Sequence, residues 1–132
     1  MKDTIQVWMT LDKLHATVNQ RLEKHLKSHY NLTTSEFTVI TVLYEESKNG
    51  CAIQQLSEAV NLSHSAVSRL VARLETCHTV ERLSTDADRR STLVKLTNQG
   101  RRDYEETLPG IRTIINQIFE EKKEQLHDLC SK

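Results

Sequence analysis

Residues 62–75, LSHSAVSRLVARLE, decide the fold of this chain. The apolar residues of this stretch recur at the helical spacing i, i+3, i+4 and i+7, and they are Val67, Leu70, Val71 and Leu74. Such spacing places all of them on one stripe of a helix, where they can be buried together. Ser63 stands where an N-cap belongs. The stretch therefore predicts a helix with one buried face.

The opposite face of this helix carries small hydrogen-bond donors and guanidinium groups. At about 3.6 residues per turn, the residues that point away from the stripe are Ser65, Ser68, Arg69, Ala72 and Thr76, with His64 and Arg73 on the flanks. A helix in the major groove of DNA needs short side chains at closest approach, hydroxyls for phosphates, and arginine for the acceptors of guanine. This face is typical of a DNA-recognition helix.

A second, shorter apolar pattern precedes the recognition helix. Its members are Ile53, Leu56, Ala59 and Val60. The residues Asn61-Leu62-Ser63 form a tight turn between the two patterns. The combination predicts a helix-turn-helix.

Two β-prone runs follow, at residues 80–84 and 92–96, with a polar tip between them. Adjacent arginines at the tip, Arg89 and Arg90, suit a narrow minor groove with its concentrated negative potential. A carboxylate near DNA is repelled unless it is paired, so we interpret Asp88 as orienting a nearby arginine such as Arg90. The alternative is a charged tip that only stays solvated.

These segments resemble the MarR family of winged-helix transcriptional regulators. The stretches that carry the resemblance are LSHSAVSRLVARLE at 62–75, VERL at 80–83 and DADRRSTLVKLTNQG at 86–100. The last of these is similar to the family's D-x-R wing followed by L-T-x-x-G. Through this resemblance Arg90 corresponds to the wing-tip arginine and Asp88 to its paired aspartate.

The resemblance covers nearly the whole chain and implies a mainly α fold with a small β-hairpin wing. It implies a single domain, 1–132, in which residues 33–97 form the winged helix-turn-helix and residues 1–30 and 98–132 form dimerisation helices. The expected DNA-binding residues are Ser63, His64, Ser65, Ser68, Arg69, Arg73, Asp88, Arg89 and Arg90. The expected partners are double-stranded DNA with an inverted-repeat operator, a second copy of the chain, and a small-molecule effector.

Three positions depart from the family pattern. His78 and Thr79 stand where the family has glycine and a large apolar residue, and a histidine in a left-handed cap is uncommon. Ala52 occupies the cap position of the helix that begins near Ile53, which predicts a weaker helix start. None of these changes removes a predicted DNA contact.

The regions outside the helix-turn-helix and wing are predicted to be helical. A helix from about Asp3 to His29 carries one apolar side, Thr33 or Thr34 caps a second helix, and Thr97 caps a third. We expect Pro109-Gly110 to break that third helix. The apolar side of the first helix is Leu11, Leu14, Val18, Leu22 and Leu26, and the final stripe is Ile111, Ile114, Ile115, Ile118, Phe119, Leu126 and Leu129. The length and spacing of both stripes fit a dimer interface.

Composition narrows the function classes. The chain has 18 basic and 18 acidic residues, but residues 62–102 hold eight basic against four acidic ones, so positive charge gathers where DNA contact is predicted. With three glycines there is no phosphate-binding glycine loop, and no catalytic arrangement is supported by spacing. We expect no enzyme activity and no cofactor. Without a membrane span or a secretory signal, the expected location is cytoplasmic.

We favour the interpretation that the chain is a dimeric, sequence-specific transcription regulator. It is expected to act as a repressor that leaves the DNA when a small effector binds. One alternative is a winged-helix module for protein contacts. A metal-sensing variant would use His25 with His29, or His127 with Cys130, although two residues make only half a site. A redox-sensing variant would use Cys77, while Cys51 is expected to be a buried structural thiol. An odd number of cysteines, three, argues against a disulfide framework.

Overall fold

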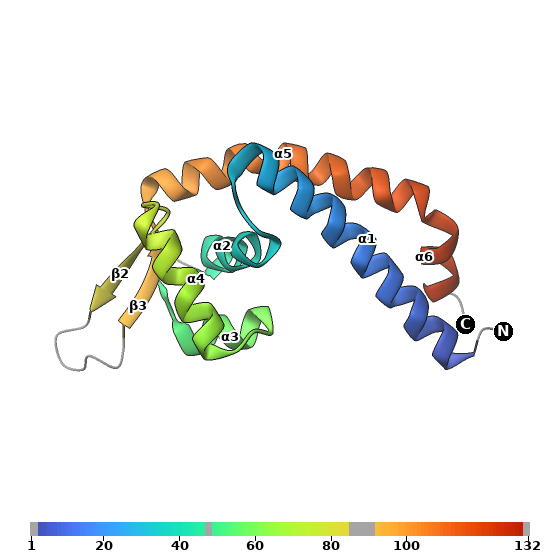
Figure 1. Ribbon diagram of the computed structural model, residues 1–132, viewed down its shortest axis with the longest axis horizontal. Helices are drawn as coiled ribbons and strands as arrows, with labels where there is room; N and C mark the ends of the chain where they lie inside the picture. Colours follow the sequence, from blue (N-terminus) through green and yellow to red (C-terminus); the bar gives the residue numbers. More distant parts are fainter. Residues whose placement is uncertain (1–2, 47–48, 85–91, 131–132) are drawn as a thin grey trace. The chain divides into compact units, whose positions relative to one another are not determined.

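The computed structural model describes residues 3–46, 49–84 and 92–130 of the chain. It is mainly helical with a small antiparallel sheet, which confirms the predicted fold class (Figure 1). The elements in chain order are α1 Thr4–Tyr30, α2 Thr34–Glu46, β1 Cys51–Ala52, α3 Ile53–Val60, α4 His64–Thr76, β2 Val80–Ser84, β3 Thr92–Leu96, α5 Asn98–Glu121 and α6 Lys123–Cys130. The chain forms two compact units. The central unit is residues 35–107, and the terminal unit combines the residues up to Thr34 with those from Leu108 onward.

Helix α4 is held in the central unit by the predicted apolar stripe. Its fully buried members, at most 1% exposed, are Val67, Val71 and Leu74. Leu70 is half-buried. Ser63 caps the helix, because its Oγ accepts the backbone N–H of Ala66 at 3.1 Å. Each buried valine or leucine contributes roughly 1.5–3 kcal/mol, so the stripe determines which face of α4 remains outside.

The turn between α3 and α4 has the predicted form. Asn61 ends α3 in the left-handed conformation, with φ 57°, and its backbone N–H donates to the carbonyl of Ser57. At the other end, Ala52 offers no side-chain cap, as the sequence indicates, but Gln55 Oε1 accepts the Ala52 N–H at 3.0 Å. Ala59 is exposed while Ser57 is buried, so the apolar face of α3 is narrower than predicted.

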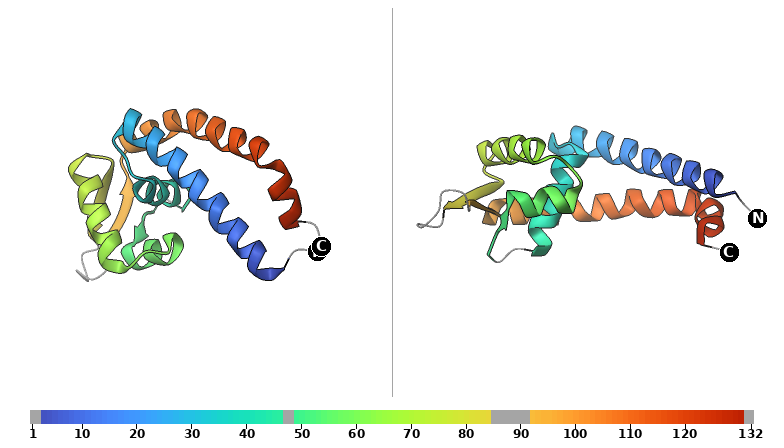
Figure 2. Two further views of the ribbon diagram at one scale, coloured as in Figure 1. Left: turned by 45° about the vertical axis from the view of Figure 1, so that its right-hand side comes forward. Right: turned by 90° about the horizontal axis from the view of Figure 1, so that it is seen from below.

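The sheet has three strands in the order β1-β3-β2, all antiparallel. Strands β2 and β3 have the predicted bounds, and Val80 pairs with Leu96 at the base of their hairpin. Strand β2 packs beside α4 (Figure 2). Strand β1 was not predicted. It has two residues and exists only because Cys51 pairs with Val94 of β3, which lies far along the chain.

Thr97, in the connection between β3 and α5, forms hydrogen bonds with two of the residues that join α4 to β2. His78 adopts the left-handed conformation, with φ 61°, at the position where the family has glycine. The Thr97 hydroxyl donates to the His78 carbonyl at 2.7 Å, and the Thr97 N–H donates to the Thr79 carbonyl at 3.0 Å. Thr97 Oγ1 also accepts the N–H of Gly100 at 2.9 Å, which confirms the predicted cap of α5. A Cβ at position 100 would overlap the Thr79 carbonyl oxygen.

In the terminal unit, burial increases along α1 from its start to its end. Leu26 is fully buried, Leu14, Val18 and Leu22 are half-buried, and the exposed apolar residues near the start are Ile5, Trp8, Met9 and Leu11. Arg21 of α1 forms an ion pair with Glu121 of α5 at 2.6 Å. Near the end of α1, Glu23 Oε2 accepts the backbone N–H of Thr34 at 2.8 Å.

The predicted helix break at Pro109-Gly110 is wrong. Helix α5 continues through Pro109, and the next helix begins only at Lys123. A proline removes one backbone hydrogen bond, and neighbouring contacts can maintain the helix around it. Here Thr107 and Ile111 on either side are buried, and the Thr113 hydroxyl donates to the Pro109 carbonyl at 2.9 Å.

Candidate nucleic-acid interface

The predicted recognition face of α4 is open to solvent. Its exposed residues are Ser63, His64, Ser65, Arg69, Ala72 and Thr76, and Ser68 is half-buried. The Ser63 and Ser65 hydroxyls lie 3.4 Å apart at the first turn. Hydroxyls and N–H groups at a helix N-terminus suit an anionic phosphate, because the helix dipole is positive there. The fold therefore brings five predicted site residues, from Ser63 to Arg69, onto one surface.

Arg69 lies in the second turn of this surface. Its side chain is exposed and makes no ion pair or hydrogen bond within the part of the chain that the structure describes. A guanidinium without an internal partner keeps all its donors for a ligand, and the two parallel donors match the two acceptors on the edge of guanine.

Arg73, one turn further along, is held by a carboxylate that the sequence analysis missed. Its Nη1 lies 3.1 Å from Oε1 of Glu36 in α2, and Glu36 is fully buried while the Arg73 side chain is 47% exposed. A buried carboxylate is costly unless it is paired, so the pair ties α4 to α2. In the sequence, Glu36 lies in the first turn of a helix, where acidic residues are common because a negative charge interacts favourably with the helix dipole.

The charged side chains at the base of the hairpin form ion pairs with one another or with α4. Arg82 of β2 pairs with Glu75 of α4 at 3.2 Å, and Lys95 of β3 pairs with Glu81 of β2 at 3.5 Å. The predicted site residues at the wing tip, Asp88, Arg89 and Arg90, lie outside the described residues. Among the described residues of the predicted DNA surface, the positive charge therefore lies mainly on α4.

The cysteines divide into one buried and one exposed thiol. Cys51 is 5% exposed, as expected for a structural thiol, and its pKa is raised by burial and by the nearby Glu46 carboxylate. Cys77, at the end of α4, is exposed and free. The side chain of Cys130 lies outside the described residues.

In the histidine pair proposed for metal sensing, one ring nitrogen of His25 is buried and His29 is exposed. The rings of His25 and His29 lie 4.4 Å apart, but His25 Nε2 is buried and has no hydrogen-bond partner, and a Cβ on Gly110 would lie 3.0 Å from it. Burial and the neighbouring His29 lower the pKa of His25. Within the described ranges, no three His, Cys, Asp or Glu side chains come close enough to hold a metal ion.

No helix in the described part of the chain is long and apolar enough to cross a membrane.

Comparisons with known proteins agree with this architecture. A family model described as MarR family matches residues 30–91. Among curated proteins, the transcriptional regulator MhqR of Bacillus subtilis is 23% identical over 128 residues, covering 97% of this chain and 86% of MhqR. Among solved structures, AbsC, a MarR family transcriptional regulator from Streptomyces coelicolor, is 26% identical with a TM-score of 0.80, covering 98% of this chain and 88% of AbsC.

A third similar protein was solved with DNA. Sco3205, a MarR family transcriptional regulator from Streptomyces coelicolor in complex with DNA, has a TM-score of 0.81 at 21% identity, covering 98% of this chain and 86% of its own. In its sequence and its fold, the chain is therefore similar to MarR family transcriptional regulators.

Proposed function

We propose that the protein is a dimeric, sequence-specific DNA-binding transcription regulator, and a repressor that a small-molecule effector releases from its operator. The observation that carries this proposal is the face of α4 beside strand β2 of the wing, where Arg69 and the hydroxyls of Ser63 and Ser65 are exposed to solvent. The similar proteins named above are transcriptional regulators, and one of them was solved with DNA. An enzymatic role has no support from them.

In this mechanism, α4 enters the major groove with its N-terminal turns foremost. The hydroxyls of Ser63 and Ser65 bind a phosphate, Arg69 reads a guanine edge, and Arg73, positioned by Glu36, binds the sugar-phosphate backbone with its remaining donors. The wing-tip residues Asp88, Arg89 and Arg90 are proposed to reach the adjacent minor groove. We propose a cytoplasmic location for this role.

The two-fold symmetry of a dimer sets the form of the operator. Paired recognition helices read an inverted repeat when they lie about one helical turn of DNA apart, roughly 34 Å. An effector that favours another spacing of the two helices weakens DNA binding by its differential affinity for the two states. We propose residues 33–97 as the DNA-binding part, and residues 1–30 with 98–132 as the dimerisation part of a single domain.

The proposal is tested by a gel-shift titration with the DNA upstream of the protein's own gene, at fixed salt concentration. Arg69→Ala should weaken binding by about 1–3 kcal/mol, the usual cost of one good base contact, and Arg90→Ala should act similarly from the minor groove. Arg112→Ala is the matched control, because Arg112 is an exposed arginine of α5 in the terminal unit. Equal affinity of wild type, Arg69→Ala and Arg90→Ala would overturn the assigned DNA face. A chain that binds a protein partner and no DNA would be an interaction module instead.

A further inference from the structure

Two carboxylates meet the first turn of α2 or belong to it, and each makes a contact with a different helix. Glu23 of α1 accepts the backbone N–H of Thr34 at 2.8 Å through its Oε2. Glu36, two positions after Thr34, accepts Nη1 of Arg73 in α4 at 3.1 Å through its Oε1. One short stretch of backbone therefore connects a side chain of α1 with the helix that carries the proposed DNA surface.

Glu23 acts as a cap for α2. The first backbone N–H groups of a helix have no partner within the helix, and a carboxylate there satisfies one of them and interacts favourably with the helix dipole. The Thr34 side chain also hydrogen-bonds to Glu23, and the two bonds together lower the pKa of the Glu23 carboxyl. The start of α2 is thus held by a residue that lies 11 positions earlier in the chain.

The turn that Glu23 caps also places Arg73. Glu36 is fully buried, so its carboxylate has little freedom to follow its partner. The position of the Arg73 guanidinium therefore depends on where the first turn of α2 puts Glu36. The Arg73 side chain is 47% exposed, which leaves part of it available to a phosphate.

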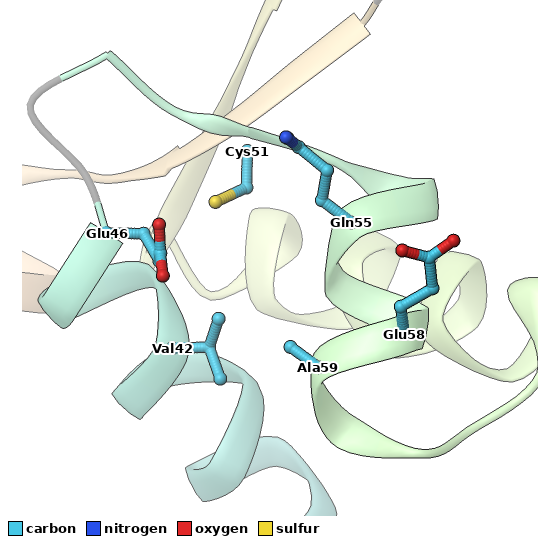
Figure 3. A pocket seen from close by; sticks show the side chains of 6 residues that line it. All are labelled: Val42, Glu46, Cys51, Gln55, Glu58 and Ala59. Atoms are coloured by element: carbon cyan, nitrogen blue, oxygen red, sulfur yellow. The ribbon is translucent and has the colours of Figure 1, made fainter.

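The packing of α2 is less complete toward its end. Ile40 and Leu43 are buried in the core of the central unit. A cavity of about 370 Å³ opens beside Cys51, Val42 and Glu46, between the last turns of α2, strand β1 and helix α3 (Figure 3). Because fewer neighbours hold α2 at that end, the contacts of its first turn matter more for its placement.

Helix α2 crosses the boundary between the two compact units. Thr34 still belongs to the terminal unit, and the helix from Ser35 onward belongs to the central unit. The contact with Glu23 is made in the terminal unit, and the contact between Glu36 and Arg73 is made in the central unit. The continuous helical backbone from Thr34 to Glu36 links the two contacts.

We propose that Glu23 is a positioning residue for DNA binding: it caps the first turn of α2, this turn places Glu36, and Glu36 holds Arg73 in the orientation that binds the DNA backbone. This role rests on the DNA-binding function proposed above and adds a residue of the terminal unit to it. When the cap is lost, the first turn of α2 opens in part of the molecules. The apparent DNA affinity then falls with the fraction that remains competent.

The test is a cycle of DNA affinities, measured by gel shift at fixed salt concentration. Glu23→Ala should weaken binding at least about threefold, as expected for the loss of a helix cap, and by no more than Arg73→Ala does. In the Arg73→Ala background Glu23→Ala should have no further effect, whereas in the Arg69→Ala background it should keep its full effect. Glu45→Ala is the matched control, because Glu45 is an exposed glutamate of α2, and it should leave DNA affinity unchanged.

A second measurement needs no DNA. Exchange of the Arg73 Nε–H with water, followed by NMR in the free protein, should be faster in Glu23→Ala than in the wild type, while exchange of the Arg69 Nε–H stays the same. Unchanged exchange at Arg73, or an effect of Glu23→Ala on DNA affinity that persists in the Arg73→Ala background, would overturn the positioning role. A wild-type protein that binds no DNA, with faster Arg73 exchange in Glu23→Ala, would refute the proposed function and still support the link from Glu23 to Arg73.

Discussion

At the scale of single residues, two arginines of the same helix have different tasks. Arg69 is exposed and has no partner among the residues that the structure describes, whereas Arg73 one turn later is paired with the fully buried Glu36. In the sequence both arginines lie on or beside the polar face of the predicted helix, so both were assigned to DNA. The structure separates them, because a buried carboxylate on another helix makes Arg73 part of the packing between α2 and α4.

Because of this difference, we expect alanine substitutions of the two arginines to differ in their effect on the free energy of unfolding. Arg73→Ala should lower the free energy of unfolding by about 1–3 kcal/mol, because it leaves the buried Glu36 carboxylate with one partner fewer. Arg69→Ala, the matched control in the same helix, should leave stability within about 0.5 kcal/mol of wild type. Urea denaturation followed by circular dichroism measures both values.

The partnership itself is tested by a double-mutant cycle with Glu36→Gln. The loss in the double variant should be smaller than the sum of the two single losses by about 1 kcal/mol or more. Strictly additive losses would show that Arg73 stabilises the protein without Glu36.

At the scale of elements, the connection from β3 to α5 is as important as the recognition helix. Thr97 binds the carbonyls of His78 and Thr79 and also caps α5, so one side chain links three elements of the winged helix. Gly100 permits this contact, since any side chain there would meet the Thr79 carbonyl. The L-T-x-x-G motif thus has a physical reason: it fixes the place where the wing leaves α4.

Gly100→Ala should therefore destabilise the protein by about 1–3 kcal/mol, the usual cost of overpacking, despite the better helix propensity of alanine. Gly110→Ala is the matched control in the same helix, where the added Cβ meets the ring edge of His25 rather than backbone. A side chain can move aside, and alanine gains about 1 kcal/mol in helix propensity, so the net change should be clearly smaller. Thermal unfolding of both variants checks this, and a Gly100→Ala protein as stable as wild type would refute the packing argument.

The hydrogen bond between Glu23 and Thr34 predicts a pH dependence of stability. It lowers the pKa of the Glu23 carboxyl below its ordinary value. The unfolded chain then binds the proton more readily than the folded one, so the contribution is complete above the unfolded pKa of about 4.3 and is lost as the pH falls through the lower folded pKa. Glu23→Gln should cost about 0.5–1 kcal/mol at pH 7. The difference from wild type should shrink as the pH falls below the unfolded pKa, and a constant difference from pH 7 to pH 3 would contradict this cause.

At the scale of the whole molecule, the terminal unit leaves apolar surface uncovered. Ile5 is 58% exposed, Trp8 65%, Leu11 52% and Phe119 49%. Large apolar side chains that stay exposed favour an interaction surface, and a symmetric pair of chains covers the same residues in both copies. This exposure is what supports the proposed dimer.

We expect the protein to sediment as a dimer at micromolar concentration and Trp8→Glu to shift it toward monomer, because a charge would then be buried in the interface. Gln20→Glu adds the same charge at an exposed polar position of α1 and should remain dimeric. Trp8 is the only tryptophan of the chain, so its emission should also shift to shorter wavelength as the dimer forms on concentration. A wild-type monomer at micromolar concentration would refute the proposed working unit.

Local patterns in the sequence were sufficient for most elements of this protein. The apolar spacing of residues 62–75, the Ser63 cap and the two β-prone runs predicted α4, β2 and β3 with nearly correct bounds, because periodicity and capping act within a few residues. The exposed site residues from Ser63 to Arg69 followed from the same periodicity, since the face opposite a buried stripe must be outside. The family and its regulatory function were also accessible from these motifs.

Only the tertiary structure decided the features that depend on distant residues. Strand β1 exists through its pairing with β3, α5 continues through Pro109 between the buried Thr107 and Ile111, and Arg73 is paired with the buried Glu36 of another helix. The cavity beside Cys51 likewise needs α2 and α3 to converge. Each of these features depends on which groups are buried and which distant residues they contact. Those contacts exist only in the folded chain, so local sequence patterns do not reveal them.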